Sequence, residues 1–278
     1  MTVRMSEHLT CNTNLSDAAG WSSSKVESHE TLLHLDGVSR HFGSLKAING
    51  VSFEMDAGEL RAVIGPNGAG KTTFFNLISG LHAPTSGHVW FAGRDITYST
   101  IEERVALGIV RTFQITEIFP ELSVYENIRL GVETAAKVSP MPWISHQTRV
   151  ALDRRIGELI ETVELGDKRE RFVGELAHGD QRVVEVAIAL SLQPRLLLLD
   201  EPTAGMGDIE TERMVGLMKR LHAEQHVSIL FIEHDMDIVF GLAQRITVLD
   251  QGRTLAEGKP EEISINPRVR AAYLGEVK

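Results

Sequence analysis

The sequence predicts an α/β fold, and three observations support this prediction. Short apolar runs of strand length alternate along the chain with segments of helical apolar spacing. One candidate strand leads through a glycine-rich turn directly into a candidate helix, and another ends in two adjacent carboxylates. Between about residues 115 and 190 the apolar spacing is helical, as in Ile156, Leu159, Ile160 and Val163. We therefore expect an α/β core into which a helical subdomain is inserted.

Eight short apolar runs are candidate strands. They are Leu32 to Val38, Val51 to Met55, Glu59 to Ile64, His88 to Phe91, Leu196 to Leu199, Ser228 to Ile232, Ile246 to Leu249 and Thr254 to Glu257. The order of these runs, with helical segments between them, is typical of an α/β core.

Length and composition limit the possible classes of protein. The 278 residues are 42% hydrophobic and can bury one large core. No segment approaches the roughly 20 apolar residues that cross a bilayer. Residues 1–30 are polar and lack a secretory signal, so we expect a disordered extension; its Cys11 is the single cysteine and favours a reducing compartment. The net charge of −10 argues against a nucleic-acid partner.

The glycine-rich turn has the spacing of a loop that holds a nucleoside triphosphate. It lies between the strand candidate Glu59 to Ile64 and a helix candidate that starts at Thr73. Glycines let backbone N–H groups converge on phosphate, and the helix N-terminus adds partial positive charge. Lys71 would reach the β- and γ-phosphates, and the Thr72 hydroxyl would coordinate Mg²⁺. The predicted nucleotide-binding residues are Gly65, Pro66, Asn67, Gly68, Ala69, Gly70, Lys71, Thr72 and Thr73.

The apolar run Leu196 to Leu199 ends in Asp200 and Glu201. A buried central strand delivers its last residues to the sheet edge where nucleotides bind. Asp200 would hold Mg²⁺, directly or through water, and Glu201 would polarise the attacking water. Either acid alone would more often be a helix cap or a solvated side chain. An apolar strand that ends in both acids, downstream of such a loop, favours catalysis.

Three further segments have the order and spacing of one family. They are Arg111-Thr112-Phe113-Gln114, Glu175 to Arg182, and Ile232-Glu233-His234-Asp235. Together they resemble the ATP-binding subunit of an ABC transporter, from about Leu32 to the C-terminus. The resemblance implies one ABC ATPase domain over residues 31–278, a P-loop NTPase core with N-terminal antiparallel β elements. The helical subdomain at about 115–190 is inserted in it, and short helices follow at about 260–278.

The resemblance also implies roles for single residues. Gln114 would touch Mg²⁺ and the water, and His234 would contact the γ-phosphate. The signature loop, which closes on the ATP of the opposite subunit, would comprise Leu176, Ala177, His178, Gly179 and Asp180. The loop that crosses the dimer interface would comprise Gly205, Met206, Gly207 and Asp208. Phe42 would stack on adenine, although packing in the core is an open alternative for this residue.

The signature loop departs from the family's common Leu-Ser-Gly-Gly-Gln pattern. Ala177 replaces the serine, His178 the first glycine and Asp180 the glutamine. One lost neutral hydrogen bond is worth about 1 kcal/mol, so we expect a weakened composite site. The Ala-His-Gly form resembles a variant of importers for branched-chain amino acids and for urea or short amides.

Other segments support both of these solute classes. Resemblance to the branched-chain group rests on Gly108 to Gln114, Val124 to Ile128, Leu255 to Ile263, Asn266 to Val269 and Ala272 to Gly275. Resemblance to the urea type rests on Ala204 to Met206 and Glu233 to Met236. We expect an importer ATPase, foremost for branched-chain amino acids. The alternatives are a urea or short-amide importer and a soluble ABC ATPase that does not transport; a GTPase is disfavoured because no Asn-Lys-x-Asp motif is present.

The resemblance implies ATP and Mg²⁺ as cofactors and several partners. These are membrane permease subunits, a second ATPase subunit in a homo- or heterodimer, and, indirectly, an extracytoplasmic solute-binding protein. The chain would be cytoplasmic and peripheral on the inner face of the plasma membrane, with Ile115 to Glu121 contacting a membrane partner. The charged run Asp167 to Arg171 is interpreted as a solvated face or loop.

Overall fold

The computed structural model describes residues 30–112, 118–137 and 145–274. The described strands form two sheets, with orders β2-β1-β4-β5 and β10-β9-β3-β8-β7-β6. The strands are β1 (Thr31–Phe42), β2 (Leu45–Asp56), β3 (Leu60–Ile64), β4 (Ser86–Phe91), β5 (Arg94–Asp95), β6 (Ile109–Arg111), β7 (Leu196–Asp200), β8 (Ser228–Ile232), β9 (Arg245–Asp250) and β10 (Arg253–Gly258). The helices are α1 (Lys71–Ser79), α2 (Ile101–Ala106), α3 (Val124–Ala135), α4 (His146–Thr162), α5 (His178–Ser191), α6 (Asp208–Gln225), α7 (Met236–Leu242), α8 (Pro260–Ser264) and α9 (Pro267–Leu274), with short 3₁₀ turns η2 (Gly166–Lys168) and η3 (Val173–Glu175).

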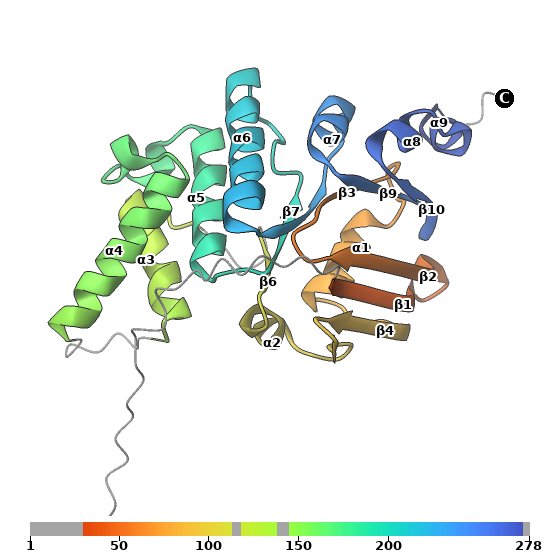
Figure 1. Ribbon diagram of the computed structural model, residues 1–278, viewed down its shortest axis with the longest axis horizontal. Helices are drawn as coiled ribbons and strands as arrows, with labels where there is room; N and C mark the ends of the chain where they lie inside the picture. Colours follow the sequence, from red (N-terminus) through yellow and green to blue (C-terminus); the bar gives the residue numbers. More distant parts are fainter. Residues whose placement is uncertain (1–29, 113–117, 138–144, 275–278) are drawn as a thin grey trace, which may run out of the picture.

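The six-stranded sheet is parallel except for β10, and it separates two hydrophobic cores. Successive side chains of a strand point to opposite faces. Leu197 and Leu199 of β7 therefore join a core with α3 to α7, whereas Leu196 and Leu198 join a core with α1 and the four-stranded sheet. Figure 1 shows these two groups on opposite sides of the sheet. Burial on both faces explains why its central strands are continuous apolar runs.

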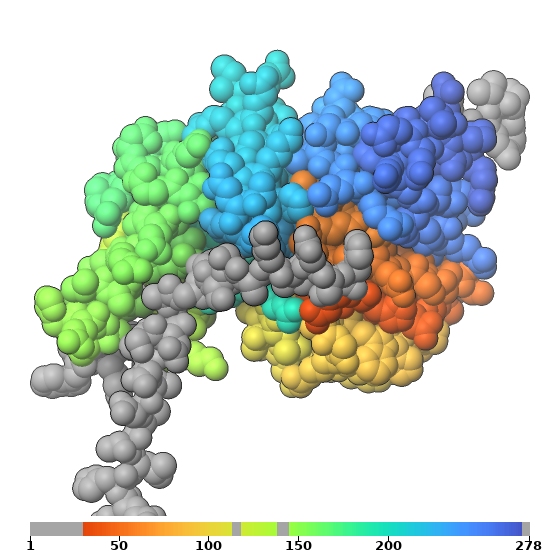
Figure 2. All heavy atoms as spheres, in the orientation of Figure 1, coloured from red at the N-terminus to blue at the C-terminus, as the bar shows by residue number. Residues whose placement is uncertain are grey.

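The predicted α/β fold class is confirmed. The N-terminal strands β1 and β2 pair antiparallel, and α3, α4 and α5 pack on one another in the segment predicted to be helical. In the space-filling view the α3–α4 region (green), the C-terminal helices (blue) and the β1-to-β4 region (red to yellow) occupy separate parts of the visible surface (Figure 2). The domain boundaries near 115–190 and 260–278 stay predictions. The predicted disordered extension lies, except for Glu30, outside the described residues.

A buried arginine closes the C-terminal end of α1. Arg104 is 1% exposed, and its Nη1 donates to the carbonyls of Leu77, at 2.6 Å, and Ile78, at 2.8 Å. Its Nη2 donates to the carbonyl of Ile96 at 2.6 Å. Burial lowers the pKa of Arg104 to about 10. These bonds satisfy the last carbonyls of α1, which have no partner within the helix, so the helix that follows the glycine-rich loop is fixed at its far end.

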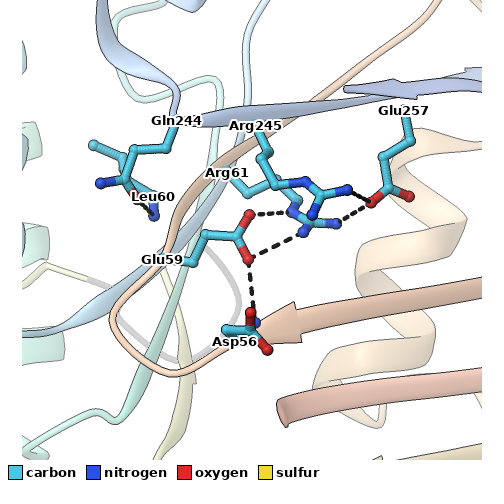
Figure 3. A network of polar contacts seen from close by, with 7 residues as sticks. All are labelled: Asp56, Glu59, Leu60, Arg61, Gln244, Arg245 and Glu257. Carbon is cyan, nitrogen blue, oxygen red and sulfur yellow. Dashed lines mark hydrogen bonds and ion pairs between the residues drawn. The ribbon is translucent and has the colours of Figure 1, made fainter. Parts of the chain in front are cut away.

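A second buried arginine is the centre of a polar network that links four strands. Arg61 of β3 is 1% exposed; it donates to both carboxylate oxygens of Glu59, at 2.7 and 3.0 Å, and to Glu257 of β10 at 2.8 Å (Figure 3). Arg245 of β9 donates to the same oxygen of Glu257 at 3.0 Å. The Asp56 backbone N–H at the end of β2 donates to Glu59 at 3.1 Å. This polar network, which is buried at Arg61 and Glu59 and half exposed at Arg245, therefore joins β2 of the four-stranded sheet to the six-stranded sheet.

Candidate nucleotide-binding site

The glycine-rich loop connects β3 to α1, as predicted, and curls around the amine of Lys71. Nζ of this buried lysine donates to the carbonyls of Gly65, at 2.6 Å, and Pro66, at 3.2 Å. Burial lowers the pKa of Lys71, and the carboxylates of Glu201 and Asp200 oppose that shift. The ammonium therefore lies inside the loop with two carboxylates near it, where it can neutralise phosphate charge.

Two glycines of the loop lie directly against other parts of the backbone. A Cβ added to Gly65 would lie 2.2 Å from the Leu249 carbonyl oxygen, and one added to Gly70 would lie 2.5 Å from that of Ala47. Gly70 is also the N-cap of α1, with φ of 105°. No side chain fits at either position, because the colliding atoms belong to neighbouring strands. The helix N-terminus is thus held close to the sheet edge, where a phosphate would bind.

The two acids lie where the strand order predicts. Asp200 ends β7, and the Glu201 backbone N–H donates to the carbonyl of Ile232 on the neighbouring strand β8 at 2.9 Å. Nε2 of His234 lies 2.9 Å from Oε1 of Glu201, and both side chains are about half exposed. Glu201 has φ of 50°, a left-handed conformation that is strained for a non-glycine residue. The carboxylate predicted to polarise the attacking water and the histidine predicted to contact the γ-phosphate are therefore in contact.

Glu233 is a residue of this region for which sequence analysis gave no role. It is 5% exposed, and its Oε1 accepts from the backbone N–H of Thr203, at 3.0 Å, and from the Thr203 hydroxyl, at 2.6 Å. The carboxylate thereby fixes the turn that follows Glu201. Its only sequence signal was its position directly before His234.

The signature loop forms the N-terminal end of α5. Ala177 is the N-cap and makes no side-chain capping bond. The Asp180 carboxylate is 9% exposed and does not face solvent: it accepts from Lys168 at 2.7 Å and from Arg213 of α6 at 3.4 Å. The charged run Asp167 to Arg171 lies in an exposed turn, as interpreted, except that the Lys168 side chain is only 20% exposed and is paired with Asp180. We refer to Lys168, Asp180 and Arg213 as the signature triad.

The signature loop also lies close to α6 and to the loop predicted to cross a dimer interface. A Cβ on Gly179 would lie 2.7 Å from the Glu210 side chain on α6. A Cβ on Gly205 would lie 3.7 Å from the His178 ring, so these two residues are near neighbours. In that loop Gly205, Gly207 and Asp208 are exposed, while Met206 is half-buried.

Phe42 is exposed, with 41% of its surface accessible, so packing in the core is excluded for it. The ring lies 4.7 Å from the guanidinium carbon of Arg40 and contacts His82 edge-on, with 5.4 Å between ring centroids. Its stacking on adenine stays a prediction. Gln114 lies outside the described residues; Thr112, which precedes it by two, donates its backbone N–H to Leu198 of β7 at 3.1 Å.

Comparison with known proteins identifies the family. Residues 48–204 match the family model described as "ABC transporter". The chain belongs to the ABC transporter family. Residues 253–278 match a second model, "Branched-chain amino acid ATP-binding cassette transporter". Among ABC relatives, the high-affinity branched-chain amino acid transport ATP-binding protein BraF of Pseudomonas aeruginosa is 38% identical over 251 residues, which cover 88% of this chain and 98% of BraF.

Solved ABC structures share the fold. MJ1267, an ATP-binding cassette of an ABC transporter, superposes with a TM-score of 0.77 at 30% identity, covering 88% of this chain and 99% of that one. A dimeric cassette, MJ0796 bound to ADP and Pi, superposes with a TM-score of 0.68 at 25% identity, covering 82% and 99%. Together with the matched domain, these similarities make the chain an ABC-type ATPase that binds ATP. Among the described residues, no helix is long and apolar enough to span a membrane.

Proposed function

We propose that this ATPase drives a membrane importer for branched-chain amino acids. The observation that carries the proposal is the match of residues 253–278 to the branched-chain family, because that segment lies outside the ATPase match over residues 48–204. The similarity to BraF over most of the chain supports it. The urea-like segments Ala204 to Met206 and Glu233 to Met236 keep a urea or short-amide importer as the second candidate.

Different residues of the site bind the phosphates, bind the metal and orient the attacking water during ATP hydrolysis. Lys71 and the backbone N–H groups of its loop hold the phosphates. Thr72, Gln114 and Asp200 offer hydroxyl, amide and carboxylate oxygens, the hard donors that Mg²⁺ prefers. When bound, Mg²⁺ would neutralise charge on the phosphate oxygens. Glu201 orients the attacking water, and the contact with His234 orients Glu201 in turn.

A second ATPase subunit completes the site. In this proposal the signature loop of each subunit closes on the ATP held by the other, using the N-terminal end of α5, where Ala177 and His178 are exposed. The dimeric MJ0796 structure supports such an assembly. The ATPase pair would lie on the inner face of the plasma membrane against two permease subunits. An extracytoplasmic solute-binding protein would deliver the solute, and nucleic acid would play no part.

Purification of the chain from detergent-solubilised membranes of its native host tests the proposal. We expect two membrane subunits and a second ATPase to accompany it, and uptake of labelled leucine to be lost in the Glu201→Gln variant, which still binds ATP. Uptake of labelled urea or a short amide instead would favour the second candidate. Soluble partners alone, from a preparation with full ATPase activity, would establish a non-transport ABC protein and overturn both.

A further inference from the structure

Arg111, the last residue of β6, carries a role beyond those described above. It is 3% exposed, and its guanidinium reaches two parts of the nucleotide site. Nη2 donates to Oδ2 of Asp200 at 2.6 Å, and Nη1 donates to Oδ1 of Asn76 on α1 at 2.6 Å. Its central carbon lies 5.5 Å from the ring centroid of Phe75. One buried side chain therefore bridges the helix after the glycine-rich loop and the carboxylate at the end of β7.

The backbone of Arg111 adds a third element to this bridge. Arg111 pairs with Leu198 in the parallel register of β6 and β7, and the next residue, Thr112, donates to the Leu198 carbonyl. Gln114 follows two residues later in the sequence. The segment that leads to the predicted Mg²⁺-contacting glutamine thus begins at the residue that holds the predicted Mg²⁺-binding carboxylate.

The guanidinium is a fixed positive charge in this bridge. Burial lowers the pKa of Arg111, the Asp200 carboxylate opposes the shift, and an arginine stays protonated in proteins. The contact is short and joins two charged groups, so it restricts rotation of the carboxylate. A bound cation and the guanidinium would share the charge of one carboxylate, and two positive charges on one acid weaken each other's binding.

We propose that Arg111 is a positioning residue that orients Asp200 for Mg²⁺ and limits the affinity of the site for the metal. The proposal rests on the role proposed for Asp200. It predicts two separable effects of removing the guanidinium. Without the shared charge, the metal binds more tightly; without the bridge to Asn76 and Asp200, the bound metal is misplaced and turnover falls.

Binding of fluorescent mant-ATP to the full chain, in EDTA and across a Mg²⁺ titration, tests the first effect. For Arg111→Met we expect the affinity for mant-ATP in EDTA to be unchanged, because Arg111 does not belong to the glycine-rich loop that holds the phosphates. The Mg²⁺ concentration at half-saturation should fall on the order of 10-fold. We expect kcat at saturating Mg²⁺ to fall about 10-fold or more, with KM for ATP changing less.

Two further variants keep the test decisive. Arg111→Lys retains the charge but replaces the rigid planar guanidinium with one flexible amine, which does not fix the carboxylate in the same way. Mg²⁺ affinity should therefore stay near wild type while kcat falls, and this variant also serves if Arg111→Met does not fold. Asp200→Asn should itself weaken the Mg²⁺ response. If Asp200→Asn leaves that response unchanged, the proposed role of Asp200 fails. If Asp200→Asn weakens it while a folded Arg111→Met matches wild type, or Arg111→Lys keeps full kcat, only the role of Arg111 fails.

Discussion

The glycine-rich loop and the signature loop both present a helix N-terminus suited to phosphate, yet they are held by different means. In the first, Gly65 and Gly70 lie against backbone carbonyls that cannot move away. In the second, the buried Asp180 is held by ion pairs from Lys168 and Arg213. A position that lies against a backbone carbonyl accepts only glycine. A position that is held by side-chain ion pairs accepts a different residue if the paired charges change with it. This difference accounts for the intact pattern of the glycine-rich loop and the altered pattern of the signature loop.

The largest expected effect comes from a methyl group at Gly70. Gly70→Ala places Cβ 2.5 Å from the Ala47 carbonyl oxygen and forces φ of 105° on an alanine, so we expect about 3 kcal/mol lower unfolding free energy and loss of ATP binding. Urea denaturation and mant-ATP titration measure both. Gly68→Ala is the matched control, since φ is also positive there but nothing lies within 4 Å. Equal behaviour of the two variants would refute the collision argument.

Breaking the signature triad should give the next largest effect. Asp180→Ala leaves Lys168 without its buried partner and frees the end of α5, so we expect kcat of the assembled ATPase to fall about 10-fold or more, with about 1–3 kcal/mol lower unfolding free energy. The affinity of the isolated chain for ATP should not change, because its own glycine-rich loop is intact. Steady-state ATPase assays and mant-ATP binding separate these two readouts.

The exposed ion pair between Arg169 and Glu170, near the signature triad, provides the control for Asp180→Ala. Glu170 is 80% exposed on its side chain and pairs only with Arg169 among the described contacts, so Glu170→Ala should leave both readouts unchanged. If Asp180→Ala weakened ATP binding by the isolated chain as much as it slowed turnover, the triad would act through general stability instead.

Removing the exposed ring of Phe42 should have a smaller effect. A base stacked on an aromatic ring gains about 1 kcal/mol or more, so Phe42→Ala should weaken ATP binding about 5- to 10-fold, and Phe42→Trp should restore it. The matched control is Tyr98→Ala, since Tyr98 is 77% exposed and lies in another segment. Full affinity of Phe42→Ala would remove Phe42 from the site.

The smallest expected effect is an increase in kcat/KM, from the substitution Ala177→Ser. Ala177→Ser returns a hydroxyl to the N-cap of α5, where it can cap the helix or reach phosphate. A single hydrogen bond of about 1 kcal/mol corresponds to a rise of up to about 5-fold in kcat/KM of the assembled ATPase. Steady-state kinetics measure it, and an unchanged kcat/KM would mean that backbone N–H groups alone hold phosphate at this loop.

The elements whose determinants are local could be predicted from the sequence. The strands β7 and β8, and β3 apart from Arg61, were predicted because burial on both faces makes them apolar runs. The glycine-rich loop was predicted because its spacing is contained in eight residues. The three-residue strand β6 and the two-residue strand β5 were missed, since neither is long enough to show a period.

The contacts that join distant segments could not be predicted in this way. Arg111 and Asp200 are 89 residues apart, and their pairing depends on β6 lying beside β7. Lys168 was interpreted as solvated because charged runs usually are. Its side chain instead pairs with Asp180, because the packing of α4, α5 and α6 brings these two residues together. Strand order and helix packing are global properties, so their consequences for single charges appear only in three dimensions.

The Arg61 network has a consequence for chimeric proteins. Arg61 lies four residues before Gly65, and its outer partner Glu257 belongs to the C-terminal segment that matches the branched-chain family. Exchanging that segment for one from another ATPase therefore also exchanges Glu257, one of the two carboxylates that bind the buried Arg61. A graft without an acid at position 257 would leave Arg61 paired with Glu59 alone and one buried N–H donor without its acceptor, which costs about 1–3 kcal/mol.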